Sequence, residues 1–299
     1  MKKYIFLFII VFLITHCVLL PTIALKATKD GILTWFYQIL PALLPFIIIS
    51  GVFIRSGWID SLPIQNPVFP IILTLFCGTL FGFPVGAKLS CDFYTRNHIN
   101  KRQAGILCVC SNNFGPMYVN GYVIPLLFGK KDVSFSIICL LYGIPILIGI
   151  ILLVYTGNSN MTHKKTASRF QLDMQIIDAG IISGFETLIK ICGYIVLFSL
   201  ITAFCMYYMG NLTLQGIFLL GNLEITNGIK ILSDISISKS VKFLFAIQFL
   251  SFGGVSGFAQ TASFLSAVHI SIKKYLLGKM FLSVILVIIS LILRLNLFL

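Results

Sequence analysis

The chain has 299 residues, of which 58% are hydrophobic and only 10% are charged, and its mean hydropathy is +1.00. This composition excludes a single water-soluble core and indicates an all-α polytopic membrane protein. The net charge of +13 comes from Lys and Arg in short links between apolar runs. This distribution indicates membrane topology and not a nucleic-acid partner. We therefore expect one membrane domain, residues 1–299, surrounded by the lipid bilayer.

The chain opens with a retained first helix from about Tyr4 to Leu25, since no small-residue cleavage site follows this run. Residues 32–55 come next and contain Pro41 and Pro45. Proline removes a backbone donor and bends helices, so this segment could be either a kinked span or a re-entrant hairpin.

Two later runs of the first half are broken by residues that are costly in lipid. Residues 67–90 are interrupted near their end by GFPVG, and residues 103–127 are interrupted by SNNFGP. A plain span would not place Asn, Gly and Pro at mid-membrane depth. Residues 133–155 form an ordinary apolar helix, and the polar stretch 157–173 links the two halves.

The second half has a similar order of segments. A long run over 178–210 comes first, followed by 212–232, which EITNG breaks, and 242–268, which SFGGVSGFAQT breaks. A basic link that ends at Lys279 leads to the last helix.

The two halves can be superposed at a constant offset of 142 residues without an insertion. The offset pairs five positions, so that Gly51, Gly86, Lys88, Asp92 and Gly115 fall on Gly193, Gly228, Lys230, Asp234 and Gly257. This match predicts an internal repeat. The predicted parts are residues 31–127 as the first repeat, 128–176 as connecting helix and loop, 177–268 as the second repeat and 269–299 as the C-terminal helix.

The positive-inside rule separates the possible topologies. More of the basic residues lie inside if segments 32–55 and 178–209 both re-enter than if the first spans alone or if both span. This model has about seven spanning helices and two re-entrant hairpins, with the N-terminus inside and the C-terminus outside. The two repeats are then inverted in the membrane, as in many secondary transporters.

A helix that breaks inside the membrane exposes amide groups at one end and carbonyls at the other, and can bind a polar solute there. We therefore expect a solute site at the breaks, built from Gly86, Lys88, Ser111, Asn112, Asn113, Glu224, Thr226, Asn227, Lys230, Ser256 and Gln260. Glu224 is the strongest single candidate, because it lies well inside an apolar run. The two lysines have a second interpretation, since each is four residues from an aspartate and could be neutralised by it on a helix.

The sequence gives no sign of an enzyme. It shows no recognisable pairing of nucleophile and base, no metal-ligand spacing and no cofactor motif. The sequence does not indicate a coupling ion.

Several motifs, in order, resemble the sporulation integral membrane proteins of the YlbJ/SpoVV type in the Gate, or nucleoside-recognition, domain group. The motifs are LPALLPFIIISG, GFPVGAKLSCD, CSNNFGPMYV, LEITNGIK and FGGVSGFAQ, and they cover about residues 35–270. The resemblance implies a bacterial membrane protein with the plan of concentrative nucleoside transporters. It also implies a link to the movement of dipicolinic acid across the outer forespore membrane.

These observations leave three functions open. The first is a transporter or facilitator of a small polar, anionic metabolite, with dipicolinic acid as the named candidate. The second is a transporter of a nucleoside or related metabolite. The third is a sporulation scaffold or assembly factor that moves nothing, although a scaffold has no need of polar breaks in its helices.

Overall fold

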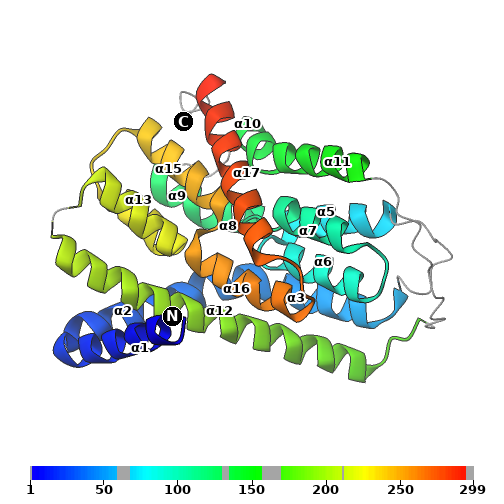
Figure 1. Ribbon diagram of the computed structural model, residues 1–299, viewed down its shortest axis with the longest axis horizontal. Coiled ribbons are helices and arrows are strands. Elements are labelled where there is room, and N and C mark those ends of the chain that lie inside the picture. Colours follow the sequence, from blue (N-terminus) through cyan, green and yellow to red (C-terminus); the bar gives the residue numbers. More distant parts are fainter. Residues whose placement is uncertain (1, 59–67, 130–134, 157–169, 211, 294–299) are drawn as a thin grey trace.

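The computed structural model of the chain describes residues 2–58, 68–129, 135–156, 170–210 and 212–293 (Figure 1). Every regular element in these ranges is helical. Several helices, α12 among them, run roughly along the long axis of the molecule, whereas α13, α15 and α17 are tilted against it (Figure 1).

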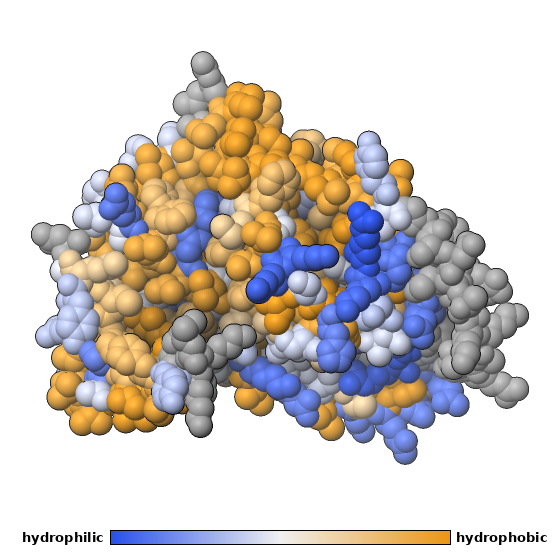
Figure 2. All heavy atoms as spheres, in the orientation of Figure 1, coloured by the Kyte–Doolittle hydropathy of each residue, from blue (hydrophilic) through white to orange (hydrophobic). Residues whose placement is uncertain are grey.

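Five helices in the described ranges are long and apolar enough to cross a membrane. They are Pro21–Arg55, Phe135–Thr156, Met174–Met209, Lys239–Ala267 and Ile272–Ile292. Shorter apolar helices cover Leu7–Leu19, Val68–Phe81 and Leu214–Leu223. Apolar side chains cover much of the upper and left parts of the face in Figure 2. The chain is therefore a multi-pass membrane protein, as the composition predicted.

The first helix is shorter than the sequence suggested. Helix α1, Lys2–Leu19, ends well before Leu25, and α2, Pro21–Thr34, begins directly after it. Pro21 occupies the first turn of α2, where its missing N–H needs no partner. Residues 26–30, which follow the expected end of the first helix, are thus part of α2.

The predicted hairpin at residues 32–55 is wrong. Helix α2 continues through a π-helical turn, η1 (Trp35–Ile39), into α3 (Leu40–Arg55). The π turn ends two residues before Pro41, and η2 (Val119–Val123) and η3 (Cys139–Gly143) end at the same distance before Pro125 and Pro145. Widening the turn accommodates the proline ring and its missing N–H, so these prolines do not break their helices.

The predicted hairpin at residues 178–209 is also wrong. This segment belongs to α12, Met174–Met209, a single helix of 36 residues. It packs against α3 through small residues: Cβ atoms added at Gly180 and Gly184 would meet the side chains of Val52 and Ile48. Such close contacts are typical of helix pairs in membranes.

Within the described ranges two helical hairpins occur, each one segment later in its half than the predicted hairpin. The first joins α5 (Val68–Phe81) to α6 (Val85–Thr95). A Cβ added at Gly78 in α5 would lie 2.9 Å from the Gly86 Cα atom in α6, so the arms touch backbone to backbone. Gly82 makes the turn with a φ of +73°, which favours glycine.

The second hairpin joins α13 (Leu214–Leu223) to α14 (Ile225–Asp234). Its arms also meet at two glycines, because a Cβ at Gly228 would collide with the Gly221 Cα atom. The first hairpin lies on the right of Figure 1, and α13 of the second lies on the left.

Each hairpin is followed by a helix that breaks midway. Helix α7 (Lys101–Ser111) ends at the SNNFGP motif, and the chain resumes as α8 (Pro116–Tyr118), η2 and α9 (Ile124–Phe128). Helix α15 (Lys239–Phe252) ends at Gly253, and α16 (Gly254–Ala267) follows. The remaining helices are α10 (Phe135–Ile138), α11 (Ile144–Thr156) and α17 (Ile272–Ile292). The order of a long helix, a hairpin and a broken helix thus occurs twice.

We expect Gly228→Ala to destabilise the protein, because the added methyl group meets the Gly221 backbone, which has no rotamer by which to move aside. Overpacking of this kind costs about 1–3 kcal/mol. The measurement is the unfolding temperature in detergent. Gly193→Ala in α12 is the matched control, since no atom lies within 4 Å of its added Cβ. Equal unfolding temperatures for the two variants would contradict the close packing of the hairpin.

Candidate functional site

The tip of the first hairpin is bound to the break that follows α7. The Phe83 backbone N–H donates to the Asn113 carbonyl at 2.7 Å, and a Cβ at Gly82 would collide with the backbone of Gly115. The break at residues 112–115 leaves carbonyls without helical partners, and the hairpin tip supplies one donor.

Two other elements supply donors to the same break. The Lys279 Nζ atom donates to the Asn112 carbonyl at 2.9 Å and to Asn113 Oδ1 at 2.7 Å. The Tyr142 hydroxyl donates to the Phe114 carbonyl at 3.0 Å. Three consecutive carbonyls are therefore satisfied by a hairpin, by α17 and by η3.

The tip of the second hairpin lies against the break between α15 and α16. A Cβ at Gly254 would lie 3.1 Å from Ile225 Cγ1 and 3.4 Å from the Asn222 carbonyl oxygen. Glu224 ends α13 and caps α14, because its carboxylate accepts from the Asn227 N–H at 2.7 Å. Glu224 is buried.

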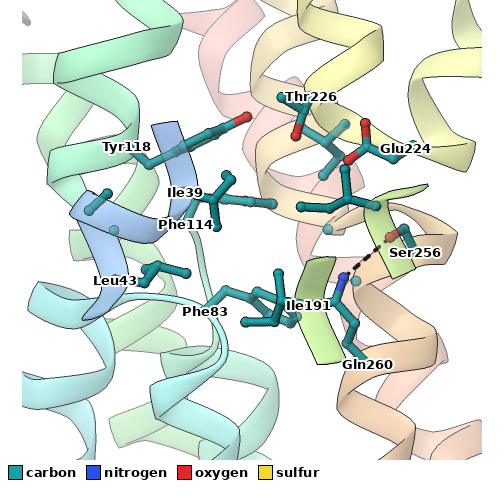
Figure 3. Close-up of a pocket in the computed structure, with 16 residues that line it drawn as sticks. Ile39, Leu43, Phe83, Phe114, Tyr118, Ile191, Glu224, Thr226, Ser256 and Gln260 are labelled. Carbon is teal, nitrogen blue, oxygen red and sulfur yellow. Dashed lines mark hydrogen bonds between the residues drawn. The ribbon is translucent and has the colours of Figure 1, made fainter. Parts of the chain in front are cut away.

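The two tips and the two breaks surround one buried cavity of about 40 Å³ (Figure 3). Its wall combines residues from both halves: Ile39, Ala42, Leu43, Phe83, Phe114, Gly115, Tyr118, Ile191, Ile195, Glu224, Ile225, Thr226, Gly253, Ser256, Gly257 and Gln260. The halves touch here, since a Cβ at Gly257 would lie 3.8 Å from the Phe83 ring.

Two polar atoms of this wall have no hydrogen-bond partner among the described residues. They are the Tyr118 hydroxyl and Gln260 Oε1, and both side chains are buried. The amide group of Gln260 donates to Ser256 Oγ at 3.2 Å (Figure 3). Buried polar groups in folded proteins are nearly always paired, so these two atoms point to a polar ligand or water in the cavity.

At the start of α6, the Ala87 N–H donates to Asn112 Oδ1 at 3.4 Å. The starts of α8 and α16, which follow Gly115 and Gly253, have no side-chain cap among the described residues. The free amide groups and the helix dipole at such ends favour a negative group. Glu224 opposes this field, because it is the one ionisable carboxylate in the wall.

The cavity collects four of the predicted site residues, namely Glu224, Thr226, Ser256 and Gln260. The three polar residues of the SNNFGP motif are also buried, but they hold the break together. The Asn112 amide donates to Thr261 Oγ1 and to the Tyr275 hydroxyl, both at 3.1 Å, and the Asn113 amide donates to the Cys110 carbonyl. Ser111 Oγ donates to the Leu107 carbonyl of its own helix.

The other predicted site residues lie away from this cavity. Gly86 packs against the Ser111 backbone, and Lys88 Nζ is 3.4 Å from Ser183 Oγ. Asn227 donates to Ser199 Oγ at 2.9 Å, and Lys230 forms an ion pair with Asp30 at 3.2 Å.

Both Asn227 and Lys230 line a second, larger cavity of about 460 Å³. Among the described residues, neither predicted lysine–aspartate pair forms an ion pair.

Lys279 is a polar centre that the sequence interpretation assigned to a basic link. The structure places it inside α17 with 2% of its surface exposed, between the two breaks, since its Cε atom lies 3.9 Å from a Cβ added at Gly253. A signal was present, because Lys279 is surrounded by the apolar run YLLGKMFLSV. An ionisable residue within such a run indicates a functional or pairing role.

The described part of the chain contains no group of three or more His, Cys, Asp and Glu side chains suited to a metal ion. The polar chemistry at the cavity therefore rests on hydroxyl, amide, carboxylate and backbone groups.

The chain is 26% identical to the sporulation integral membrane protein YlbJ of Bacillus subtilis, over 92% of its own length and 78% of that protein's. The chain is thus similar to a sporulation integral membrane protein of the YlbJ type. The resemblance predicted from the motifs is thereby confirmed at the level of the YlbJ type. No family model and no solved structure matches the chain.

We expect Lys279→Met to destabilise the protein, because the Asn112 carbonyl and Asn113 Oδ1 would lose their donor while staying buried. Each unsatisfied group costs about 1–3 kcal/mol. The measurement is the unfolding temperature in detergent. Lys273→Met, at an exposed position of the same helix, should change stability by no more than about 0.5 kcal/mol. An equal effect of the two variants would show that Lys279 does not hold the break.

Proposed function

We propose that the chain is a transporter or facilitator that carries a small polar solute through the cavity between the two hairpin tips and the two breaks. The observation that carries this proposal is the pair of unpartnered buried atoms, the Tyr118 hydroxyl and Gln260 Oε1, in the wall of that cavity. A scaffold or assembly factor gains nothing from buried polar atoms without partners, because they only lower its stability.

We propose that the repeated order of elements reflects two inverted repeats within residues 31–127 and 177–268. In this topology the first hairpin enters from inside and the second from outside, and about seven segments cross the membrane. The chain path supports it, because α7 starts just after the first hairpin ends and α15 starts just after the second ends. Alternating access would then come from movement of the two repeats around the shared cavity.

The wall supports a planar aromatic solute that carries an anionic group. The Phe114 ring lies 6.0 Å from the Phe83 ring and 5.0 Å from the Tyr118 ring, centroid to centroid, which provides aromatic surface. The uncapped helix starts can receive a carboxylate. Dipicolinic acid combines both features, and the sporulation name of the relative makes it the first solute to test.

A nucleoside is the second candidate solute. A nucleobase offers the same aromatic faces without a charge, so it avoids the repulsion that a dianion would meet from Glu224. Hydrogen bonds to Gln260 and Thr226 suit an uncharged base.

The cavity of about 40 Å³ has room for only a few water molecules. We propose that it represents a closed state, and that a metabolite enters when one hairpin tip moves away from its break. In a sporulating cell the proposed location is the outer forespore membrane.

Uptake into proteoliposomes tests the proposal. We expect labelled dipicolinate or a labelled nucleoside to enter faster than into protein-free liposomes, and Tyr118→Phe to lower the uptake about tenfold. Loss of one hydrogen bond to the solute, about 1.4 kcal/mol, accounts for this factor. The unfolding temperature should not fall, because the deleted hydroxyl has no partner within the described protein.

Tyr122→Phe is the matched control, since Tyr122 is a neighbouring, half-buried tyrosine that does not line the cavity. It should leave uptake unchanged. Flux of both solutes equal to that of protein-free liposomes would contradict transport of these solutes and would favour the scaffold.

A further inference from the structure

A groove of about 640 Å³ lies between α7, α11 and α17, away from the central cavity. Its walls are mainly apolar, with Ile106 and Val109 from α7, Ile148 and Leu152 from α11, and Phe281 and Leu282 from α17. The volume lies within the range of roughly 300–1,000 Å³ that is typical of ligand sites. Because α11 and α17 are membrane-crossing by length and composition, this groove borders the lipid.

Two glycines shape the groove. A Cβ at Gly278 would lie 2.8 Å from a methyl group of Val109, so α17 approaches α7 closely on that side. No atom lies within 4 Å of a Cβ added at Gly105, which leaves open space over this turn of α7. The open turn provides the depth that an extended hydrocarbon chain needs.

One end of the groove is basic. Lys101 and Arg102 begin α7, and Lys274 lies in the first turn of α17; all three side chains are exposed and line the groove. None of the three forms an ion pair with another described residue.

The surrounding sequence offers no acidic partner either, since no Asp or Glu occurs from 93 to 131 or from 235 to 299. The starts of two helices meet at this end, and their dipoles add to its positive field.

Figure 2 shows a similar separation of apolar and hydrophilic side chains on the surface. The side chains over the upper part of α17 are apolar, whereas hydrophilic side chains gather lower and further to the right. A ligand of matching shape has an anionic head and an apolar tail.

We propose that this groove binds an anionic phospholipid. The phosphate is held by Lys101, Arg102 and Lys274 at the helix starts, and an acyl chain lies along Ile106 and Leu152. Basic pockets between membrane helices are suited to such head groups, and no free metabolite anion would need the apolar walls. The lipid then holds α17 against α7, the contact through which Lys279 reaches Asn112 and Asn113.

The test uses the purified, delipidated full chain in detergent and measures its unfolding temperature while phosphatidylglycerol or phosphatidylcholine is added. Phosphatidylglycerol should raise the temperature by several degrees more than phosphatidylcholine does. The triple variant Lys101→Gln, Arg102→Gln, Lys274→Gln should lose this difference. A charge-matched variant, Lys29→Gln, Lys190→Gln, Lys239→Gln, changes three exposed lysines outside the groove and should keep it.

Two further measurements test the contact with the acyl chain separately from the contact with the phosphate. Gly105→Leu fills the open turn and should weaken the response to phosphatidylglycerol, whereas Gly193→Leu, at another open helical glycine, should not. Glycerol phosphate, which has the charge without the chains, should give no shift. The proposal is overturned if the groove variant keeps the full phosphatidylglycerol response, if both triple variants lose it equally, or if glycerol phosphate reproduces it.

Discussion

The structure depends on how it satisfies the backbone carbonyls that the SNNFGP break releases in the protein interior, where Asn112 and Asn113 are buried. Asn112, Asn113 and Phe114 present these carbonyls in sequence, and each accepts from a different element. A buried carbonyl without a donor is costly, so the break can exist only where other parts of the protein reach it. The positions of the first hairpin, α17 and η3 follow from this requirement.

The second half meets the same requirement with different residues. Glu224 caps α14 with its own carboxylate, and glycines at 253 and 254 let the second tip lie close to the following helix. Because tips and breaks must contact each other in both halves, the polar groups of four interrupted segments gather at one point. The cavity, with the unpartnered Tyr118 hydroxyl and Gln260 Oε1 in its wall, forms where these segments meet.

The sequence was sufficient to find the interruptions, because Gly, Pro, Asn and Glu inside apolar runs are costly unless they are used. Glu224, Ser256 and Gln260 were predicted on this ground, and they line one cavity. Which segments turn back was not predictable from the same residues. Pro41 and Pro45 suggested a hairpin, but a π turn absorbs the first and the helix continues past the second. The arms of the two hairpins touch at pairs of glycines, Gly78 with Gly86 and Gly221 with Gly228, and such a contact is a property of a pair of helices and not of one segment.

The distribution of basic residues could not reveal that both hairpins had been predicted one segment too early in the chain. Moving each hairpin one segment along the chain leaves the basic links at 91–102 and 269–279 on the same side, so the positive-inside rule fits both arrangements equally well. Lys279 was missed for a related reason, since it was grouped with the exposed lysines of a link. Only the packing of α17 against both breaks separates it from them.

The shared cavity exists because the first hairpin tip touches the break of the opposite half, where the Phe83 ring lies beside Gly257. The direct measurement is photo-cross-linking with p-benzoylphenylalanine in place of Phe83, whose ring lies beside Gly257, followed by mass spectrometry of the linked peptides. We expect a product that joins residue 83 to the segment around Gly253–Gln260. Cross-links confined to residues 68–128 would contradict it.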